Sequence, residues 1–476
     1  MTHSITIIPG DGIGPEIITS VVRIIKKTNV KINWEQHNAG SKIFKQGISS
    51  GITNETIDSI KKNKILLKGP LETPVGYGEK SANVTLRKMF ETYANVRPVR
   101  ELPGIKSPYY GRNIDMVVIR ENVEDLYGGI ECKHTESVSE TLKIISKQGC
   151  EKIIKFAFEY ALSEGRKSIH CATKANIMKM TEGLMKKTFE DIAKLYPNIK
   201  SEHIIVDNCA HQMVMRPEQF DIIVTTNMNG DILSDLGSGL VGGLGFAPSA
   251  NLGNNIAIFE AVHGSAPTIA GKNIANPTSI ILSSVMMLRY LGELSAANNI
   301  EQALILTLEQ NHFTSDVVSN NYNKLSTTEF TDKIIKNIGK KSKSYKERII
   351  SKINMPKIKN IVNNKNIKNI VGVDVFIASN LTTKELGEGL ENLLKKTPMY
   401  LYEIANRGVK VYPNAPTQPD VVDSWQCRLY YKDQKEQSDK IIYETINKIG
   451  MFHSWVHIKK LFTINGEKAY SQSQGG

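Results

Sequence analysis

The chain has 476 residues, of which 23% are charged and 40% hydrophobic, and its formal net charge is +12. This length predicts two or three domains, and the composition is that of an ordinary soluble globular protein. No apolar run reaches the length needed to span a bilayer, and the N-terminus carries no signal or transit pattern, so we expect a cytoplasmic protein without a membrane partner.

The positive net charge is compatible with two classes of partner. A basic surface can bind nucleic acid, whereas dispersed lysines combined with an anionic substrate give the same total charge. The basic residues are densest in residues 336–368, a stretch that resembles a linker. We therefore favour a small anionic substrate and expect no nucleic-acid partner.

The five cysteines, at positions 132, 150, 171, 209 and 427, form no CxxC pair and no metal-finger spacing. Reduced thiols in a cytoplasmic protein are the simplest interpretation of this pattern. Cys209 lies near one of the candidate ligands discussed below, and we interpret it as a packing residue.

The chain begins with a short apolar strand at residues 5–8, followed by a glycine-rich turn over residues 9–16. Pro15 suits the first turn of the helix that follows, and a second strand is predicted at residues 32–35. The turn is similar to a dinucleotide fingerprint, but its glycine spacing is GxGxG and not GxGxxG. We therefore reject a Rossmann-type site at this turn.

The third predicted strand, residues 65–68, leads into a loop over residues 69–78. Ligands of open α/β sheets bind at such strand ends. Ser81, Asn83 and Arg87 follow this loop in S-x-N-x-x-x-R spacing. They fit either a carboxylate site at a helix start or a simple N-cap serine with a solvated arginine.

Two further arginines lie near or within the next predicted strand. Arg97 precedes it, and residues 116–127 form a strand that runs into a loop and carries Arg120 and Tyr127. A guanidinium group binds carboxylates in a bidentate manner, so Arg87, Arg97 and Arg120 together could neutralise a substrate with several carboxylates. Any one of these arginines alone would be interpreted as a surface salt bridge.

Residues 221–226 form a β-branched run typical of a strand buried on both faces. We expect Gly230 to break this strand and a helix to follow, which places Asp231 and Asp235, four residues apart, on one helix face. Two carboxylates so placed repel each other unless a cation lies between them, and hard divalent cations prefer such ligands. The alternative is an N-cap at Asp231 and a solvated Asp235.

Asp207 is a third candidate metal ligand, because it follows a predicted strand at residues 201–206; by itself it would be a helix N-cap. The stretch after Asp235 is rich in glycine over residues 237–245. Residues 260–267, Glu-Ala-Val-His-Gly-Ser-Ala-Pro, form a loop of small residues that a ligand could approach closely.

These motifs resemble the isocitrate/isopropylmalate dehydrogenase family, whose members oxidise and decarboxylate (2R)-hydroxy diacids. Residues 227–237 match the family's signature, and the resemblance covers roughly residues 1–340. It implies an α/β fold that is not Rossmann-like, with a large domain at residues 1–93 and 242–339. The small domain would span residues 94–241, with a short clasp at about 128–146.

The resemblance also implies a homodimer with shared active sites, because in the family the clasp and one apolar helix bury the subunit interface. Ser81 and Asn83 match the pair that isocitrate enzymes use for the extra carboxylate, where isopropylmalate enzymes have apolar side chains. We therefore expect oxidative decarboxylation of isocitrate with Mg²⁺ or Mn²⁺ and a nicotinamide cofactor. Homoisocitrate is the rival substrate.

By the same resemblance, Lys174 would assist removal of the alcohol proton and Tyr127 would protonate the carbon that carbon dioxide leaves. Lys174 and Asp207 would come from the neighbouring subunit. The substrate-binding residues would be Ser81, Asn83, Arg87, Arg97 and Arg120, and the metal ligands Asp207, Asp231 and Asp235.

The cofactor loop leaves the choice between NADP and NAD open. Thr268 and Ile269 match neither the Lys-Tyr of NADP-using relatives nor the Asp-Ile of NAD users, while Arg216 matches an arginine that NADP enzymes supply from the second subunit. This favours NADP, although Phe313 and Val317 lie where NADP enzymes have Tyr and Arg. The expected cofactor-binding residues are Thr73, Arg216, His263, Gly264, Ser265, Ala266, Pro267, Thr268, Ile269 and Asn276.

The last part of the chain changes character after a lysine- and asparagine-rich linker at residues 340–368. Residues 369–465 predict the order βαββαβ of a ferredoxin-like or ACT-like α+β domain. A tail follows at 466–476, of which residues 471–476 are expected to be disordered. The resemblance extends this far only in long bacterial members of the family. A non-enzymatic alternative for the whole chain is an RNA-binding or regulatory protein on a dehydrogenase scaffold.

Overall fold

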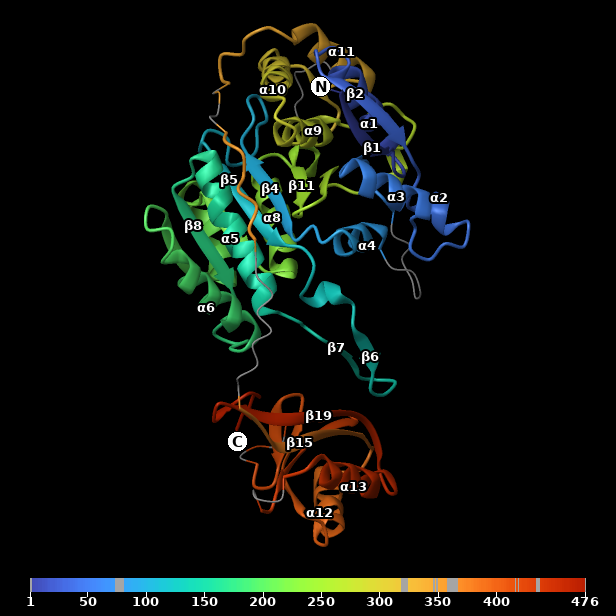
Figure 1. The fold of residues 1–476 in the computed structure, drawn as a ribbon, viewed down its shortest axis with the longest axis vertical. Helices are drawn as coiled ribbons and strands as arrows, with labels where there is room; N and C mark the ends of the chain where they lie inside the picture. The colour runs from blue at the N-terminus through green and yellow to red at the C-terminus, as the bar shows by residue number, and fades with distance from the viewer. Residues whose placement is uncertain are drawn as a thin grey trace. The chain divides into compact units, whose positions relative to one another are not determined.

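The computed structural model describes residues 2–72, 81–317, 324–345, 347, 350–357, 367–415, 417, 419–433 and 437–475. The chain forms two compact units (Figure 1). The first consists of Met1–Gly128 and Lys143–Lys359, and the second of Gly129–Leu142 and Asn360–Gly476. The short segment 129–142 therefore belongs with the C-terminal part of the chain.

A mixed ten-stranded sheet, in the order β2-β1-β3-β12-β11-β4-β5-β10-β8-β9, runs through the first unit. Its pairings are parallel except those of β4 with β5 and of β11 with both its neighbours. The strands are β1 (Thr2–Ile8), β2 (Lys31–Gln36), β3 (Ile65–Lys68), β4 (Ala94–Arg100), β5 (Asp115–Glu121), β8 (Ser168–Thr173), β9 (Lys200–Ile205), β10 (Ile222–Thr225), β11 (Pro248–Leu252) and β12 (Ala257–Ala261).

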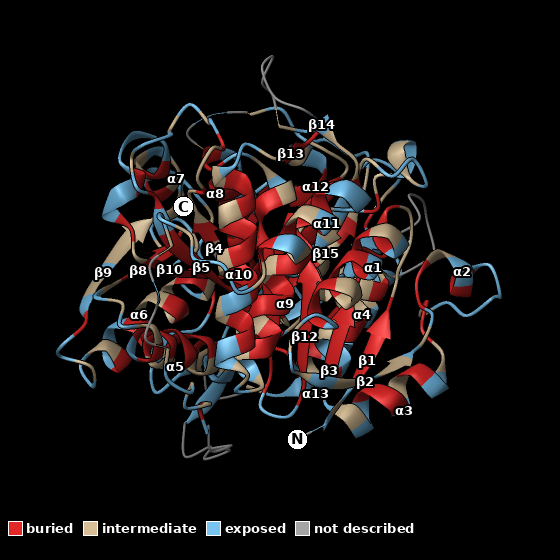
Figure 2. Cartoon of the chain, turned by 90° about the horizontal axis from the view of Figure 1, so that it is seen from above, coloured by how far each residue is buried: buried red, intermediate tan, exposed pale blue. Residues whose placement is uncertain are grey.

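Helices cover this sheet. Successive side chains of its central strands lie in different hydrophobic cores. Ile222 and Val224 of β10 join one apolar cluster, whereas Ile223 between them joins another, so this strand is buried on both faces as the sequence predicted. Figure 2 shows β1, β3 and β12 in the colour of buried residues. The helices are α1 (Gly14–Ile25), α2 (Ser41–Phe44), α3 (Asn54–Asn63), α4 (Ala82–Met89), α5 (Lys147–Glu164), α6 (Thr181–Ala193), α7 (Val206–Met215), α8 (Asn227–Leu240), α9 (Thr278–Tyr290), α10 (Leu294–Glu309) and α11 (Thr327–Asn337).

In the described part of the chain, no helix combines the length and the apolar character that a membrane span requires. The cytoplasmic location stays a prediction. The division of the first unit into a large and a small domain also stays a prediction.

The glycine-rich turn before α1 packs against a distant loop. Gly12 has a φ of +57°, and a Cβ at this position would lie 1.9 Å from the carbonyl oxygen of Ser265. The amide of Ile13 donates to the same oxygen at 2.9 Å. This turn therefore supports the 263–269 loop.

Helix α8 starts earlier than the sequence suggested. It begins at Asn227, with Thr226 at the N-cap position, so Gly230 lies inside the helix and does not separate it from the strand. A Cβ on Gly230 would lie 2.6 Å from Cβ and Cγ of Arg120. The glycine thus allows α8 to approach β5 closely, and Asp231 is not an N-cap.

The second unit is built around a six-stranded antiparallel sheet in the order β17-β16-β18-β15-β19-β20. Trp425 and a buried Arg428 paired with Asp374 and Glu403 lie in its interior. Its elements are β15 (Lys368–Ala378), α12 (Thr383–Leu394), β16 (Met399–Asn406), β17 (Val409–Tyr412), β18 (Ser424–Tyr431), α13 (Asp439–Gly450), β19 (Ser454–Ile464) and β20 (Glu467–Lys468). A small hairpin of β6 (Glu131–Lys133) and β7 (Ser139–Thr141) belongs to the same unit.

The segments predicted as a linker and as a tail both make contacts where the structure describes them. In the predicted linker, Ser351 donates its amide to the carbonyl of Ser163 at 2.9 Å, and Ile353 and Met355 pack against the core of the first unit. In the predicted tail, Gln474 bridges to Val409 beside β17. A few apolar or backbone contacts therefore suffice to fix a segment of polar composition, and the division into a linker and a tail stays a prediction.

Candidate active site

Asp231 and Asp235 project from α8 toward the buried guanidinium of Arg97. The Nη1 atom of Arg97 lies 3.2 Å from the Oδ1 atom of each carboxylate and donates to the hydroxyl of Ser234 at 2.6 Å. The cation between the two acids in one chain is therefore an arginine of β4.

Two more side chains predicted for the site converge on Asp231. Arg120 of β5 forms an ion pair with it and donates from Nε to the side-chain oxygen of Asn227 at 2.9 Å. The hydroxyl of Tyr127 donates to the other oxygen of Asp231, and the guanidinium carbon of Arg120 lies 4.8 Å from the Tyr127 ring centroid. The structure thus brings Arg97, Arg120, Tyr127 and Asp231 together.

The two carboxylates of α8 differ in their electrostatic surroundings. Burial disfavours the ionised form of both, but the guanidinium groups of Arg120 and Arg97 outweigh it and lower the pKa of Asp231. Burial raises the pKa of Asp235, and the charge of Asp231 adds to this effect against the opposing Arg97. The ionised form of Asp235 is therefore less stabilised by neighbouring positive charges than that of Asp231.

Tyr127 remains a phenol and Arg120 a cation at neutral pH. Burial and the hydrogen bond to Asp231 raise the pKa of Tyr127. Burial, together with the positive charges of Arg97 and Arg87, lowers the pKa of Arg120 to about 10, still well above neutrality.

Arg87 of α4 belongs to a second charged group, of which the sequence motifs predicted Arg87 and Asn83 but not Lys68 and Glu260. Its Nη2 atom lies 2.8 Å from Glu260 of β12, whose other carboxylate oxygen pairs with the buried Lys68 of β3. Lys68 in turn donates to Asn83 at 2.7 Å. Ser81 occupies the N-cap position of α4.

For Lys68 and for Glu260, the sequence contained one feature that could have indicated a buried charged residue. Lys68 ends the otherwise apolar run Ile-Leu-Leu-Lys, and Glu260 lies in Ala-Ile-Phe-Glu-Ala. A charged residue in a fully buried strand is rarely tolerated without a partner. Because β3 and β12 are adjacent parallel strands in which Lys68 opposes Glu260, the sheet supplies that partner.

Lys174 and Asp207 lie beside each other, after β8 and in the first turn of α7. Their Nζ and Oδ1 atoms are 3.0 Å apart, and this hydrogen bond lowers the pKa of the exposed Asp207 carboxyl. Among the described residues, Asp207 does not form a three-ligand cluster with Asp231 and Asp235. One chain therefore does not assemble the predicted metal site by itself.

Asp231 and Asp235 nevertheless fit a divalent cation. Both touch the same guanidinium nitrogen, and their side chains are 34% and 52% exposed. Two oxygen donors on one helix face, one of them short of positive charge, are suited to a hard ion such as Mg²⁺ or Mn²⁺.

The predicted cofactor residues after β12 form a loop. His263 contacts the carbonyl of Gly264 through Nδ1 at 3.1 Å, and its buried Nε2 has no hydrogen-bond partner among the described residues. Thr268 is exposed in the short turn Pro267–Ile269. The orphaned imidazole nitrogen fits a loop that binds a polar ligand.

The other predicted cofactor residues lie outside this loop. Arg216 is exposed at the end of α7. Asn276 donates to Asp316 at 2.9 Å and accepts the amide of Thr278 at 3.0 Å. Thr73 lies outside the described residues. The cofactor roles of all these residues stay predictions.

Comparison with known proteins identifies the family. The model of the isocitrate/isopropylmalate dehydrogenase family matches residues 4–334. The chain belongs to the isocitrate/isopropylmalate dehydrogenase family. Residues 368–476 match a second model, the C-terminal domain of bacterial isocitrate dehydrogenase.

Two relatives that match along nearly their whole length are named as NADP enzymes. The chain is 54% identical to isocitrate dehydrogenase [NADP] of Thermus thermophilus, over 99% of this chain and 95% of that protein. It is 38% identical to isocitrate dehydrogenase [NADP] of Rickettsia bellii, over 99% of both. A regulatory subunit of NAD isocitrate dehydrogenase from Dictyostelium discoideum is 48% identical but covers 71% of this chain and 92% of its own length.

Solved structures in the family have the same fold. A protein from Thermus thermophilus aligns with a TM-score of 0.96 and 54% identity, covering 99% of this chain and 96% of that one. Isocitrate dehydrogenase from Methylococcus capsulatus aligns with a TM-score of 0.68 and 44% identity, covering 71% of this chain and 99% of that one.

Proposed function

We propose that this protein catalyses the oxidative decarboxylation of isocitrate to 2-oxoglutarate and carbon dioxide with reduction of NADP. The observation that carries the proposal is the similarity, along nearly the whole chain and including the C-terminal domain, to the NADP-dependent isocitrate dehydrogenase of Thermus thermophilus. The convergence of arginines, carboxylates and a phenol around α8 supports it with a site of matching chemistry.

Arg87, Arg97 and Arg120 bind and orient the substrate in this proposal, with Ser81 and Asn83 at its third carboxylate. A tricarboxylate is costly to remove from water unless cations replace its hydration. In the free enzyme Asp231, Asp235 and Glu260 balance these arginines. The binding site is therefore preorganised, and the carboxylates of the substrate join ion-pair networks that are already present in the free protein.

Asp231 and Asp235 of one subunit, with Asp207 of the partner subunit, are the residues that would hold the divalent cation. When bound, Mg²⁺ or Mn²⁺ acidifies the alcohol and stabilises negative charge on the substrate oxygen. The chemistry of the donor set supports this assignment, since all three are hard oxygen ligands.

The protons move through a lysine and a tyrosine. Lys174 of the partner subunit would assist removal of the hydroxyl proton. A bound nicotinamide cofactor would accept the C–H electron pair as hydride. The bond to the β-carboxylate then breaks, its electron pair stays on the substrate, and Tyr127 donates a proton to the carbon. The raised pKa of Tyr127 keeps this proton in place until it is needed.

A homodimer follows from the shared site, and the surface of α7 and α8 supports it. Met215, Met228 and Ile232 are 56%, 40% and 57% exposed. Large apolar side chains exposed beside a catalytic helix are suited to burial against a second copy. We also propose a ferredoxin-like C-terminal domain, supported by the antiparallel order β16-β18-β15-β19 with its two helices.

Steady-state kinetics test the function directly. Isocitrate, homoisocitrate and isopropylmalate are compared with NADP and NAD, each with Mg²⁺ or Mn²⁺ and after exhaustive chelation. We expect the highest kcat/KM for isocitrate with NADP and no turnover after chelation. Higher kcat/KM for another substrate, or turnover that survives chelation, would overturn the assignment.

A further inference from the structure

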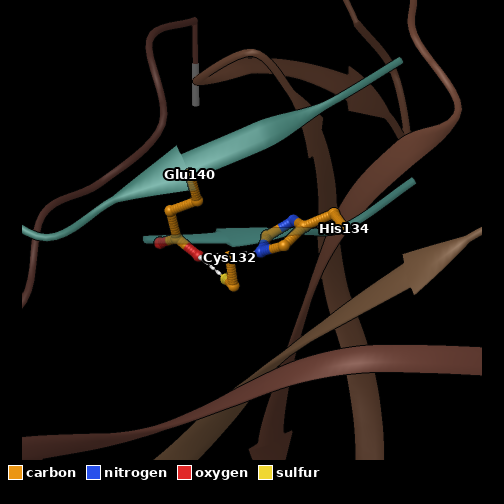
Figure 3. Close-up of side chains that lie close together, drawn as sticks. All are labelled: Cys132, His134 and Glu140. Atoms are coloured by element: carbon orange, nitrogen blue, oxygen red, sulfur yellow. Dashed lines mark hydrogen bonds and ion pairs between the residues drawn. The ribbon is translucent and has the colours of Figure 1, made fainter. Parts of the chain in front are cut away.

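Three potential metal ligands meet on the β6–β7 hairpin (Figure 3). Cys132 and Glu140 are direct partners across the two antiparallel strands. His134 follows two residues after Cys132, and residues two apart along an extended chain project to the same side. The three side chains therefore point toward one another, as the close-up shows.

The distances within this group suit a shared ion. The candidate ligand atoms of Cys132, His134 and Glu140 all lie within 4.8 Å of one another. His134 Nε2 is 2.7 Å and Cys132 Sγ 3.9 Å from the same oxygen, Oε2 of Glu140. Ligands of a tetrahedral zinc ion lie roughly 3.3–3.8 Å apart when the bonds are about 2.0–2.3 Å long. Small side-chain adjustments would therefore close the site.

His134 already has the orientation of a metal ligand. Its Nδ1 contacts the hydroxyl of Ser424 at 3.1 Å, which leaves Nε2 facing Cys132 and Glu140. Imidazole ligands are commonly fixed in this way, with the second ring nitrogen bonded to a neighbouring group. The His134 side chain is only 5% exposed, so its position is set by packing.

A second histidine reaches the same carboxylate from the C-terminal sheet. His457 of β19 lies with Nδ1 2.8 Å from Oε2 of Glu140. Its ring stacks on Phe376 of β15 at a centroid distance of 5.1 Å, and Phe376 also packs edge-on against His134 at 5.5 Å. His457 therefore contacts the carboxylate of the three-residue cluster without being one of its three mutually close ligands.

We propose that Cys132, His134 and Glu140, with His457 as the fourth donor, bind a zinc-type transition-metal ion that fixes the hairpin to the C-terminal sheet. A thiolate, two imidazoles and a carboxylate select a borderline ion such as Zn²⁺ or Co²⁺ over Mg²⁺. This distinguishes the site from the all-oxygen ligands on α8. It also does not depend on the proposed catalytic function.

The competing explanation is a hydrogen-bonded contact without metal, in which Glu140 accepts from both histidines. Hydrogen bonds alone explain the positions of the Glu140, His134 and His457 side chains, but they do not require the thiol of Cys132. Cys132 is the exposed cysteine of the chain, and Cys150, Cys171, Cys209 and Cys427 are buried. A thiolate-to-metal charge-transfer band from the folded protein would therefore arise from Cys132.

Cobalt(II) titration of the full-length protein, in saturating Mg²⁺ and without isocitrate or NADP, tests the site. We expect one equivalent of Co²⁺ to produce a thiolate-to-cobalt charge-transfer band together with the visible bands of a tetrahedral ion. Cys132→Ser should abolish the charge-transfer band while the circular dichroism spectrum stays unchanged. No band in the wild type, or an equal band in Cys132→Ser, would show that the cluster is a hydrogen-bonded contact only.

Zinc affinity, measured by competition with a chromophoric chelator, tests the other ligands with matched controls. Glu140→Gln and His134→Gln should weaken Zn²⁺ binding by at least about 100-fold, because even outer-shell partners are worth about 10- to 100-fold. Glu136→Gln, an exposed position in the same hairpin, and His453→Gln, outside the cluster, should bind like the wild type. Equal affinities in all variants would overturn the proposal.

Discussion

Asp231 is the residue on which the charges of the candidate active site converge, because Arg97, Arg120 and Tyr127 all contact its carboxylate. This side chain therefore has two tasks. It balances two buried guanidinium groups in the free protein, and in the proposed mechanism it binds the divalent cation.

Asp231→Asn should lower kcat for isocitrate by at least about a thousandfold, since it removes several kcal/mol of Lewis-acid stabilisation. Steady-state kinetics over a Mn²⁺ titration measure this loss. Asp332→Asn, which removes the exposed partner of Arg23, is the surface control and should keep wild-type rates. A loss below tenfold for Asp231→Asn at saturating Mn²⁺ would contradict the metal-ligand role.

Glu121, at the end of β5, predicts a pH dependence of stability. Burial raises the pKa of this carboxyl from 4.5 to about 7, despite hydrogen bonds from the amides of Val123 and Glu124. Below pH 4.5 the folded and unfolded chains both hold the proton. As the pH rises to about 7 the unfolded chain releases it first, so stability falls, and above that the penalty is constant.

Glu121→Gln should therefore be more stable than the wild type at pH 8, by up to about 3 kcal/mol, and should lose this advantage at pH 4.5. Denaturant unfolding of both proteins across this pH range measures the difference. The neutral amide keeps an acceptor for the two backbone amides, so the comparison isolates the charge. A difference that does not change with pH would show that Glu121 ionises normally.

At the scale of elements, the position of α8 against β5 depends on the missing side chain of Gly230. A Cβ there would lie 2.6 Å from Arg120, whereas a Cβ on Gly239 of the same helix would meet nothing within 4 Å. The two glycines are therefore a matched pair for separating steric contact from helix propensity.

Gly230→Ala should destabilise the protein by about 1–3 kcal/mol, because the added methyl group displaces Arg120 or the helix. Gly239→Ala should be neutral or stabilising by up to about 1 kcal/mol, since alanine is the better helix former. Free energies of unfolding in urea measure both. Equal effects of the two substitutions would mean that α8 tolerates a methyl group against β5.

The local sequence pattern was sufficient to predict many of the helices and strands but not the bounds of all of them. The apolar run of residues 221–226 became the fully buried β10, and the strand expected at 65–68 is β3. The start of α8 was missed because glycine lowers helix propensity locally, whereas the contact with Arg120 that selects glycine is distant in sequence.

At the scale of the whole molecule, the proposed mechanism requires two subunits to complete one site. In a heterodimer of Lys174→Ala and Asp231→Asn chains, one site combines both intact residues and the other contains both substitutions. Homodimers of either variant contain no intact site.

Coexpression of these two inactive variants with different affinity tags should therefore restore about a quarter of wild-type activity in the random mixture of dimers. Purification through both tags isolates the heterodimer, for which about half is expected. The tagged homodimers serve as controls. An inactive heterodimer would contradict a site that takes Lys174 and Asp231 from different subunits.

Sequence alone determined many of the elements and predicted the candidate site residues. Alternation, capping and glycine spacing are local, and the arginines, Tyr127 and the α8 acids lie in short recognisable motifs. The structure gathers Arg97, Arg120 and Tyr127 around the carboxylate of Asp231. The metal, substrate and cofactor roles of these residues stay predictions.

Only the tertiary structure decided which distant residues meet. Lys68 and Glu260 are paired because β3 lies beside β12, and His457 reaches Glu140 because the β6–β7 hairpin packs on the C-terminal sheet. No local pattern contains the order of strands in a sheet. That order follows from the burial of many side chains at once, so such pairings cannot be read from any single stretch of the chain.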